Sequence, residues 1–145
     1  MRRETESEDL PVTASEQKAL IFVFDDNEAI RTLVRIHLQQ AGYAVRAFED
    51  AVEGGRAMLD TPPDLLICDI NMPFLDGLEF LVAMKTDVRV ARVPTIVLTS
   101  RTDEDTEMAA ANAGAAAFLT KPLRRGDLIR SVEQVLSRRR VGSMP

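Results

Sequence analysis

The sequence lacks several features that would assign it to other classes of protein. It has one cysteine, Cys68, which forms no disulfide within the chain and stands inside an apolar run, so we expect a small buried thiol. Aromatic residues make up only 5% of the 145 residues. Cations are outnumbered, and the formal net charge of -5 argues against a general nucleic-acid binder, which needs a basic face.

Long hydrophobic segments are also missing from the sequence. No apolar run approaches the length of a membrane span, and residues 1–9 lack the apolar core of a secretory signal, so we expect a cytoplasmic protein without membrane insertion. Residues 1–17 are polar and acid-rich, which predicts a flexible extension. We expect one folded domain over residues 18–137 and a short tail at 138–145.

Short apolar runs alternate with segments of helical periodicity from Lys18 onward. The predicted strands cover residues 19–24, 43–48, 65–68, 95–98 and 117–120. The predicted helices cover residues 28–41, 50–59, 78–84 and 103–113, with a last amphipathic helix around 128–136 that ends in the basic run 138–140. This alternation predicts an α/β fold, a doubly wound five-stranded parallel sheet covered by helices on both faces.

Chemically reactive side chains follow four of the predicted strands. Asp25 and Asp26 come after the first strand, Asp69 after the third, Thr99 after the fourth and Lys121 after the fifth. Ligands bind beyond the carboxyl ends of parallel strands, so we expect these residues at one edge of the sheet. An isolated aspartate pair can be an ordinary solvated turn, but three crowded carboxylates favour a hard cation such as Mg²⁺.

Asp69 is the predicted nucleophile of this cluster. A carboxylate can attack a phosphoryl group to form an aspartyl phosphate, a reaction that needs alignment and charge neutralisation. Mg²⁺ and Lys121 can supply the positive charge, and the Thr99 hydroxyl can donate to a phosphoryl oxygen. A cis peptide between Lys121 and Pro122 would aim the lysine at the site, although most X-Pro bonds are trans.

The loop after Asp69 has its own chemistry. Pro73 restricts the backbone where the chain leaves the site. Asp76 and Gly77 are typical turn residues, and the glycine is free to adopt a positive φ.

Together these residues resemble the receiver domain of two-component response regulators, of the stand-alone type. The resemblance covers about residues 18–136. It rests on four motifs in this order: Asp25-Asp26, Asp69-x-x-Met72-Pro73-x-x-Asp76-Gly77, Thr99 and Lys121-Pro122. It implies a flavodoxin-like, three-layer α/β/α fold with the strand order 2-1-3-4-5.

The resemblance also implies a reaction and its partners. A phosphohistidine of a histidine kinase or of a histidine phosphotransfer protein would donate its phosphoryl group to Asp69. The metal, Mg²⁺ or Mn²⁺, would be bound by Asp26, Asp69 and the backbone carbonyl of Asn71, with Asp25 acting mostly through water. The protein would be a phosphoacceptor in signalling and would catalyse only its own phosphorylation and dephosphorylation.

A conformational switch is implied as well. Phosphorylation would draw the Thr99 hydroxyl inward, and Phe118, three residues before the lysine, would follow it. This would change the face formed by the fourth helix (103–113), the fifth strand (117–120) and the fifth helix (128–136), and a downstream protein would bind there. The same face offers a phosphorylation-dependent homodimer as an alternative to a monomer, and Phe118 can alternatively be a plain core residue.

Two further positions would tune the lifetime of the phosphorylated state. Asn71 and Arg101 lie two residues beyond Asp69 and Thr99, where the family controls the access of water to the acyl phosphate. Arg101 would either shield the phosphoryl group or pair with it.

Two other functions compete with the phosphoacceptor. A hydrolase similar to the haloacid-dehalogenase-like phosphatases, which also form an aspartyl phosphate, would need a second carboxylate as general acid two residues after the nucleophile, and Asn71 cannot protonate a leaving group. A receiver-like interaction module that takes no phosphate is disfavoured, because every member of the acceptor set is present. We expect no direct contact with nucleic acid.

Overall fold

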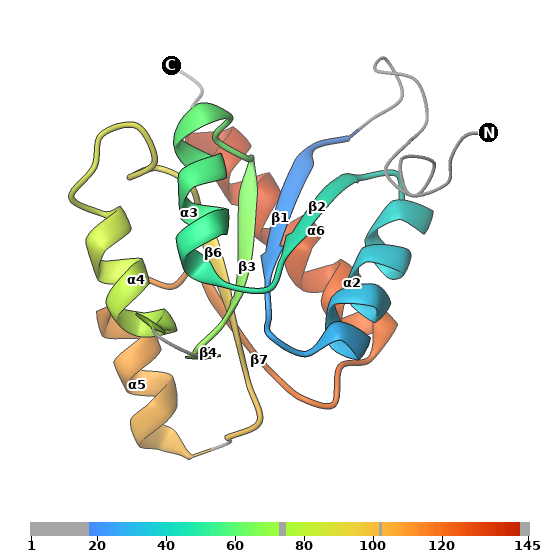
Figure 1. Ribbon diagram of the computed structural model, residues 1–145. Coiled ribbons are helices and arrows are strands. Elements are labelled where there is room, and N and C mark those ends of the chain that lie inside the picture. The colour runs from blue at the N-terminus through green and yellow to red at the C-terminus, as the bar shows by residue number, and fades with distance from the viewer. Residues whose placement is uncertain (1–17, 73–74, 102, 143–145) are drawn as a thin grey trace.

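The central sheet of the protein has five parallel strands (Figure 1). The computed structural model describes residues 18–72, 75–101 and 103–142, so the predicted extension at 1–17 and Pro73 lie outside the described residues. The strands are β1 (Leu20–Phe24), β2 (Ala44–Phe48), β3 (Leu65–Asp69), β6 (Thr95–Thr99) and β7 (Ala117–Thr120). Their spatial order, β2-β1-β3-β6-β7, is 2-1-3-4-5 counted along the chain, which confirms the predicted topology.

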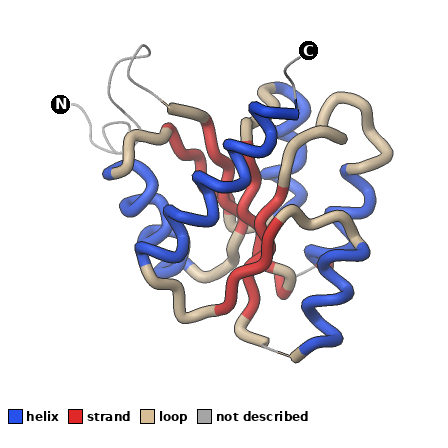
Figure 2. The backbone as a smooth tube through the Cα atoms, turned by 180° about the vertical axis from the view of Figure 1, so that it is seen from behind, coloured by secondary structure: helices blue, strands red, loops and turns tan. Residues whose placement is uncertain are grey.

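Five helices cover the two faces of the sheet. They are α2 (Glu28–Gln40), α3 (Ala51–Asp60), α4 (Gly77–Met84), α5 (Glu104–Asn112) and α6 (Arg125–Gly142). Side chains of α2 and α6 share one core cluster, and those of α3, α4 and α5 share the other. Figures 1 and 2 show the resulting three layers, with the sheet between the two groups of helices.

Polar side chains cap the helices at the positions that end the preceding loops. Asn27, Asp50, Asp76 and Asp103 each accept a hydrogen bond from a backbone N–H group in the first turn of α2, α3, α4 and α5, respectively. Such caps satisfy backbone donors that have no partner within the helix, so they fix where each helix begins. Gly42, with a φ of 100°, follows the end of α2 in the left-handed conformation that glycine tolerates best.

The two core clusters differ in composition. The cluster beneath α2 and α6 is mainly aliphatic, whereas the other contains several methionines and the rings of Phe22, Phe24 and Phe48, which contact one another at tilted and edge-to-face angles. The glycine pair in α3 belongs to this aromatic side. A Cβ atom at Gly54 would lie 2.3 Å from the Phe24 ring, and one at Gly55 would lie 3.1 Å from the Phe80 ring. The glycines that weaken α3 as a helix therefore make room for the aromatic core.

Three local features differ from what the sequence indicated. Gly77 does not have a positive φ, which among the described glycines occurs only at Gly42 and Gly114; it is instead the first residue of α4. The loop before it contains an unpredicted two-stranded hairpin, β4 (Asn71–Met72) with β5 (Leu75–Asp76). The last helix is longer than predicted, because arginine is a good helix former and a cation is favourable near a helix C-terminus.

The domain boundary predicted at residue 137 remains a prediction, although α6 continues through Gly142. Within the described ranges, none of the helices combines the length and the apolar character that crossing a bilayer requires.

Candidate functional site

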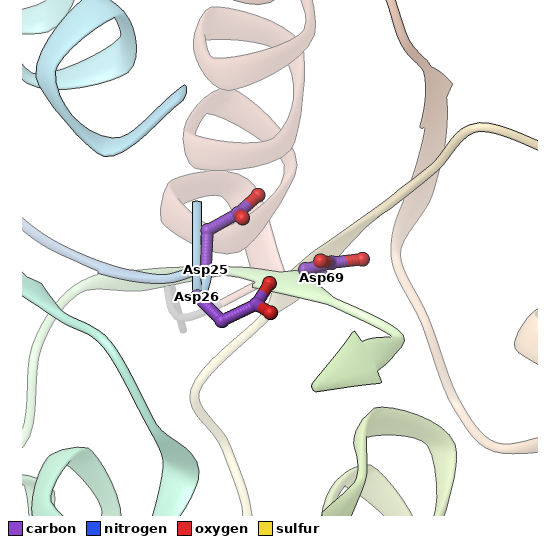
Figure 3. A group of neighbouring side chains, drawn as sticks. All are labelled: Asp25, Asp26 and Asp69. Atoms are coloured by element: carbon purple, nitrogen blue, oxygen red, sulfur yellow. The ribbon is translucent and has the colours of Figure 1, made fainter. Parts of the chain in front are cut away.

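Three aspartates meet at the carboxyl edge of the sheet (Figure 3). Asp25 and Asp26 directly follow β1, and Asp69 is the last residue of β3. Because β1 and β3 are neighbouring parallel strands, their carboxyl ends lie side by side. One carboxylate oxygen from each aspartate lies within 4.8 Å of the others. The expected acidic cluster is therefore formed, and its spacing is suited to a divalent cation with oxygen ligands.

Asp25 and Asp26 have different environments despite being adjacent. The Asp25 side chain is fully buried, whereas Asp26 is exposed to solvent. Asp25 Oδ1 accepts a hydrogen bond from the Asn27 N–H group at 2.9 Å, and its Oδ2 lies 2.9 Å from Lys121 Nζ. Asp25 is thus buried and held by Asn27 and Lys121, whereas the exposed Asp26 is the carboxylate best placed to contact a metal directly.

Arg31 is a residue of this site that the sequence analysis missed. Its guanidinium Nη1 donates a hydrogen bond to the backbone carbonyl of Asp25 at 2.8 Å. The contact ties the first turns of α2 to the acidic pair and holds the backbone where the chain turns after β1. The available signal was its position six residues after Asp25, on the helix that Asn27 caps.

Lys121 brings the fifth strand into the cluster. Its Nζ atom lies 2.9 Å from Asp25 Oδ2 and 3.4 Å from Asp69 Oδ2, and the lysine side chain is largely buried. Its backbone N–H donates to the Thr99 carbonyl at 2.7 Å, and the peptide to Pro122 is cis. Burial disfavours the charged ammonium, but hydrogen bonds and attraction to Asp25 and Asp69 outweigh this and raise the pKa of Lys121.

Asp69 carries a carboxylate in an unfavourable electrostatic position. Its side chain is almost completely buried, and its Oδ1 accepts a hydrogen bond from the Asn71 N–H group at 3.1 Å. Burial raises the pKa of the Asp69 carboxyl above its usual range, and the charge of Asp25 adds to this effect. The Asn71 N–H group and Lys121 oppose the rise without cancelling it. A bound cation would relieve this cost and would keep Asp69 ionised.

Thr99 and Arg101 lie beside the cluster in different ways. Thr99 is fully buried at the end of β6, and its Oγ1 accepts a hydrogen bond from the Arg101 N–H group at 3.0 Å. The exposed guanidinium of Arg101 donates to Asp103 Oδ2 at 3.0 and 3.2 Å. Arg101 is therefore occupied by Asp103 and does not contact the three aspartates. The hydroxyl hydrogen of Thr99 stays available to another acceptor.

Phe118 and Cys68 pack near the site without joining it. Phe118 is partly buried on β7 and packs against the aromatic core cluster. Cys68 is buried next to Asp69, and burial strongly raises the pKa of its thiol, with the neighbouring aspartates adding to the effect. The expected small buried thiol is confirmed, and such a thiol is a poor nucleophile.

Gly77 lets the loop close against the end of β3, where Asp69 lies. A Cβ atom at this position would lie 2.5 Å from the Asp69 carbonyl oxygen and 2.6 Å from Ile70 Cα, both of them backbone atoms. The Gly77 N–H group also donates to the Ile70 carbonyl at 3.1 Å. The sequence singled out this glycine, but the physical reason is close approach between backbones rather than a positive φ.

Comparisons with known proteins agree on one family. The family model described as the response regulator receiver domain matches residues 21–133. The DNA-binding dual master transcriptional regulator RpaA of Synechocystis sp. is 31% identical over 81% of this chain and 49% of its own length. The phosphate regulon transcriptional regulatory protein PhoB of Pseudomonas aeruginosa is 30% identical over 81% of this chain and 52% of its own length.

Solved structures give the same answer for the fold. A putative response regulator from Chloroflexus aurantiacus superposes with a TM-score of 0.80 at 26% identity, covering 83% of this chain and 99% of that chain. The chemotaxis response regulator CheY4 of Vibrio cholerae superposes with a TM-score of 0.78 at 29% identity, covering 82% and 99% of the two chains. The chain thus spans nearly all of these two solved chains but only about half of the RpaA and PhoB relatives.

Proposed function

The chain belongs to the response regulator receiver domain family, and from this premise we propose that Asp69 accepts a phosphoryl group from a phosphohistidine. The donor would be a histidine kinase or a histidine phosphotransfer protein. The observation that carries the proposal is the position of Lys121 Nζ, which contacts Oδ2 of both Asp25 and Asp69 at 2.9 and 3.4 Å. A cation placed between a buried carboxylate and the candidate nucleophile can neutralise an incoming phosphoryl group.

The reaction is a phosphoryl transfer between nitrogen and oxygen. A carboxylate oxygen of Asp69 attacks phosphorus and forms an O–P bond, while the P–N bond to the donor imidazole breaks. The electron pair of that bond stays on the imidazole nitrogen, which takes up a proton. Water later hydrolyses the acyl phosphate, releasing inorganic phosphate and restoring the carboxylate.

The residues around Asp69 fit a divalent cation, Mg²⁺ or Mn²⁺. Asp26 and Asp69 would bind the ion together with the backbone carbonyl of Asn71, and Asp25, whose oxygens are already engaged, would act through water. The ion would supply positive charge to the phosphoryl oxygens. The raised pKa of Asp69 supports this assignment, because an unneutralised carboxylate at this buried position is costly.

Phosphorylation would act on the surface through Thr99 and Phe118. The buried Thr99 hydroxyl keeps its hydrogen for a phosphoryl oxygen, and Phe118 lies on the neighbouring strand β7. Movement of these two side chains would change the face formed by α5, β7 and α6, where a downstream protein or a second copy of the chain would bind. The switch would be a shift between two populated conformations.

Arg101 and Asn71 would set the lifetime of the acyl phosphate. Arg101 already donates to Asp103, so pairing with the phosphoryl group would require it to give up those hydrogen bonds. We therefore favour shielding by Arg101 over direct pairing. If Arg101→Ala leaves the dephosphorylation rate unchanged, this role is wrong.

The proposal is tested by phosphorylation with a small donor. The protein is incubated with Mg²⁺ and acetyl phosphate, and intact mass is measured. We expect one phosphoryl adduct, which is lost in Asp69→Asn and retained in the control Asp60→Asn, an exposed aspartate at the end of α3. No adduct and no binding of beryllofluoride would instead favour an interaction module that takes no phosphate, and multiple turnover of an organic phosphate would favour a hydrolase.

A further inference from the structure

Two adjoining hollows between α4 and α5 form one groove, which shares α5 with the proposed α5–β7–α6 output face but does not include β7 or α6. It has two parts, with volumes of about 310 and 500 Å³, and both are lined by Leu78 and Ala109. The first part begins beside the phosphoacceptor loop at Asn71 and is mostly polar. The second part continues away from the site towards Val82 and Ala113 and is mostly apolar. We call the whole feature the α4–α5 groove.

Apolar side chains from both helices form the walls of the groove. Leu78 and Val82 are four residues apart on α4, and Ala109 and Ala113 are four residues apart at α5 and its C-cap, so each pair lies on one helical face. Val82 is 52% exposed, a large value for a valine flanked by a second helix. The alanines of α5 are too short to cover it, and an apolar strip therefore remains open to solvent.

The rim of the groove is acidic. Glu79 lines the apolar part and Asp105 lines the polar part, and neither carboxylate forms an ion pair among residues 18–72, 75–101 and 103–142. The cation in the lining, Arg101, is bound to Asp103 and its charge is already balanced. A ligand that fills the groove would therefore meet uncompensated negative charge on both sides of an apolar floor.

We propose that the α4–α5 groove binds an amphipathic helix of a partner protein, with apolar side chains on one face and lysine or arginine beside them. The apolar residues would fill the strip between Val82 and Ala109, and the cations would face Glu79 and Asp105. Helices commonly enter grooves in this way, through apolar anchors spaced by one turn. This surface shares α5 with the output face but differs from it in using α4 and in leaving β7 and α6 free.

Charge argues against a second copy of this chain as the occupant. A twofold contact would place the same surface of both copies together, so Glu79 and Asp105 of each copy would face the same acidic residues. The chain also has a net charge of -5, which adds to the repulsion between copies. A basic helix has the opposite charge, and its binding should weaken as salt is added.

The experiment uses the unmodified full chain, so its result does not depend on phosphoryl transfer to Asp69. The probe is a synthetic amphipathic helix with two leucines four residues apart, flanked by lysines; a second peptide carries glutamates in place of the lysines. Binding is followed by NMR of backbone amides and methyl groups. We expect the lysine peptide to shift resonances of Leu78, Val82 and Ala109, and the glutamate peptide to bind at least tenfold more weakly.

Matched variants locate the binding surface. Val82→Glu should weaken the lysine peptide at least tenfold, whereas Val88→Glu, at a valine that is 91% exposed outside the groove, should leave the affinity unchanged. Glu79→Gln should weaken binding severalfold and should reduce its salt dependence. Glutamine removes the charge of Glu79 while keeping nearly the same shape, so this variant separates the effect of charge on binding from the effect of packing.

Several results would overturn the proposal. Equal binding of both peptides, or equal binding to wild type and Val82→Glu, would show that the groove does not recognise a basic helix. Resonance shifts confined to α6 would place the site elsewhere. Self-association in the absence of peptide that is abolished by Val82→Glu would assign the groove to a second copy of the chain.

Discussion

On one side of the sheet, α6 buries Leu128, Val132, Val135 and Leu136 against α2 and the strands, whereas on the other side α5 buries Ala110 as the single core residue of its nine. Both helices flank β7 and both belong to the proposed output face. The difference assigns them different roles. Moving α6 would disrupt the packing of four large buried side chains, so we expect it to stay in place. Moving α5 would disrupt the packing of one buried alanine, so α5 can shift at a low cost in packing.

The same contrast extends to the chemistry. The mainly aliphatic side supports the sheet, while the aromatic side contains glycines that let elements approach closely, the capped start of α5 and the open α4–α5 groove. Asp69 sits where the two sides meet at the sheet edge. The structure therefore combines a half in which helices are anchored by large buried side chains with a half in which small rearrangements cost less packing, and the proposed switch would require the second.

Removing an anchor of α6 should produce the largest effect. Leu128→Ala deletes a fully buried side chain and should lower the free energy of unfolding by about 2–5 kcal/mol. Met108→Ala on α5, at a residue that is 64% exposed, should change it by no more than about 0.5 kcal/mol. Urea denaturation measures both values, and similar losses for the two variants would remove the distinction between the helices.

Two glycines near helix N-termini, Gly77 on α4 and Gly126 on α6, give a closer test of the contrast between the two sides of the sheet. Gly77→Ala on α4 would press a methyl group against backbone atoms of Asp69 and Ile70, and should destabilise the protein by about 1–3 kcal/mol. Gly126→Ala on α6 meets nothing within 4 Å and should stabilise the protein, by at most about 1 kcal/mol. The first variant should also slow phosphorylation by acetyl phosphate. Stabilisation by both variants would show that the loop at Gly77 relaxes freely.

These glycines also show what the sequence can and cannot predict. Helix positions and the meeting of Asp25, Asp69 and Lys121 follow from apolar periodicity and from the rule that strand ends share one edge. The strand order followed only from the resemblance to the receiver family. The reason for Gly77 did not follow, because close approach between two backbones depends on the packing of α4 against β3.

The partners of arginine side chains around the site could not be predicted from the sequence either. Arg31 contacts the Asp25 carbonyl, and Arg101 pairs with Asp103 rather than with the carboxylate cluster. Flexible arginines have several acceptors within reach at these sequence separations, so periodicity does not select among them. The fold and the acidic cluster depend on regular spacing of residues, which can be read from the sequence. The contacts of Arg31 and Arg101 depend on side-chain rotamers, which cannot be read from it.

Charge at the sheet edge should be visible in the stability of the protein. The native pKa of Asp69 is raised, so the native state holds this proton more tightly than the unfolded chain does. The contribution of Asp69 to stability must therefore fall as pH rises through the window above its ordinary pKa of about 4. Asp69→Asn should stabilise the protein at neutral pH, and the advantage should shrink as the pH is lowered towards about 4.

Mg²⁺ should offset the destabilisation that the ionised Asp69 carboxylate causes in the wild type at neutral pH. At tenfold its dissociation constant, a ligand that binds only the native state adds about 1.4 kcal/mol, and the gain should be much smaller in Asp69→Asn. Asp60→Asn, at an exposed site, should respond to pH and to Mg²⁺ as the wild type does. Thermal melts with and without Mg²⁺ measure both effects, and an equal gain from Mg²⁺ in Asp69→Asn would exclude Asp69 as a ligand.

The smallest effect is expected at the start of α5. Hydrogen bonding from the Thr106 side chain lowers the pKa of Asp103 to about 2, and the Thr106 N–H group, which donates to the Asp103 carboxylate, and Arg101 add to this effect. The cap is therefore present above the ordinary aspartate pKa and is lost as pH falls towards 2. Asp103→Ala should remove it at all pH values and should speed amide exchange in the first turn of α5.

Exchange in α6 is the control that decides this last test. Because α5 is held to the core by one alanine, loss of its cap should open α5 locally while the four anchors keep α6 closed. Faster exchange in α5 alone would establish that the two helices that flank β7 open independently. Equal acceleration in α6 would mean that they open as one unit, and a switch that moves α5 would then have to move α6 with it.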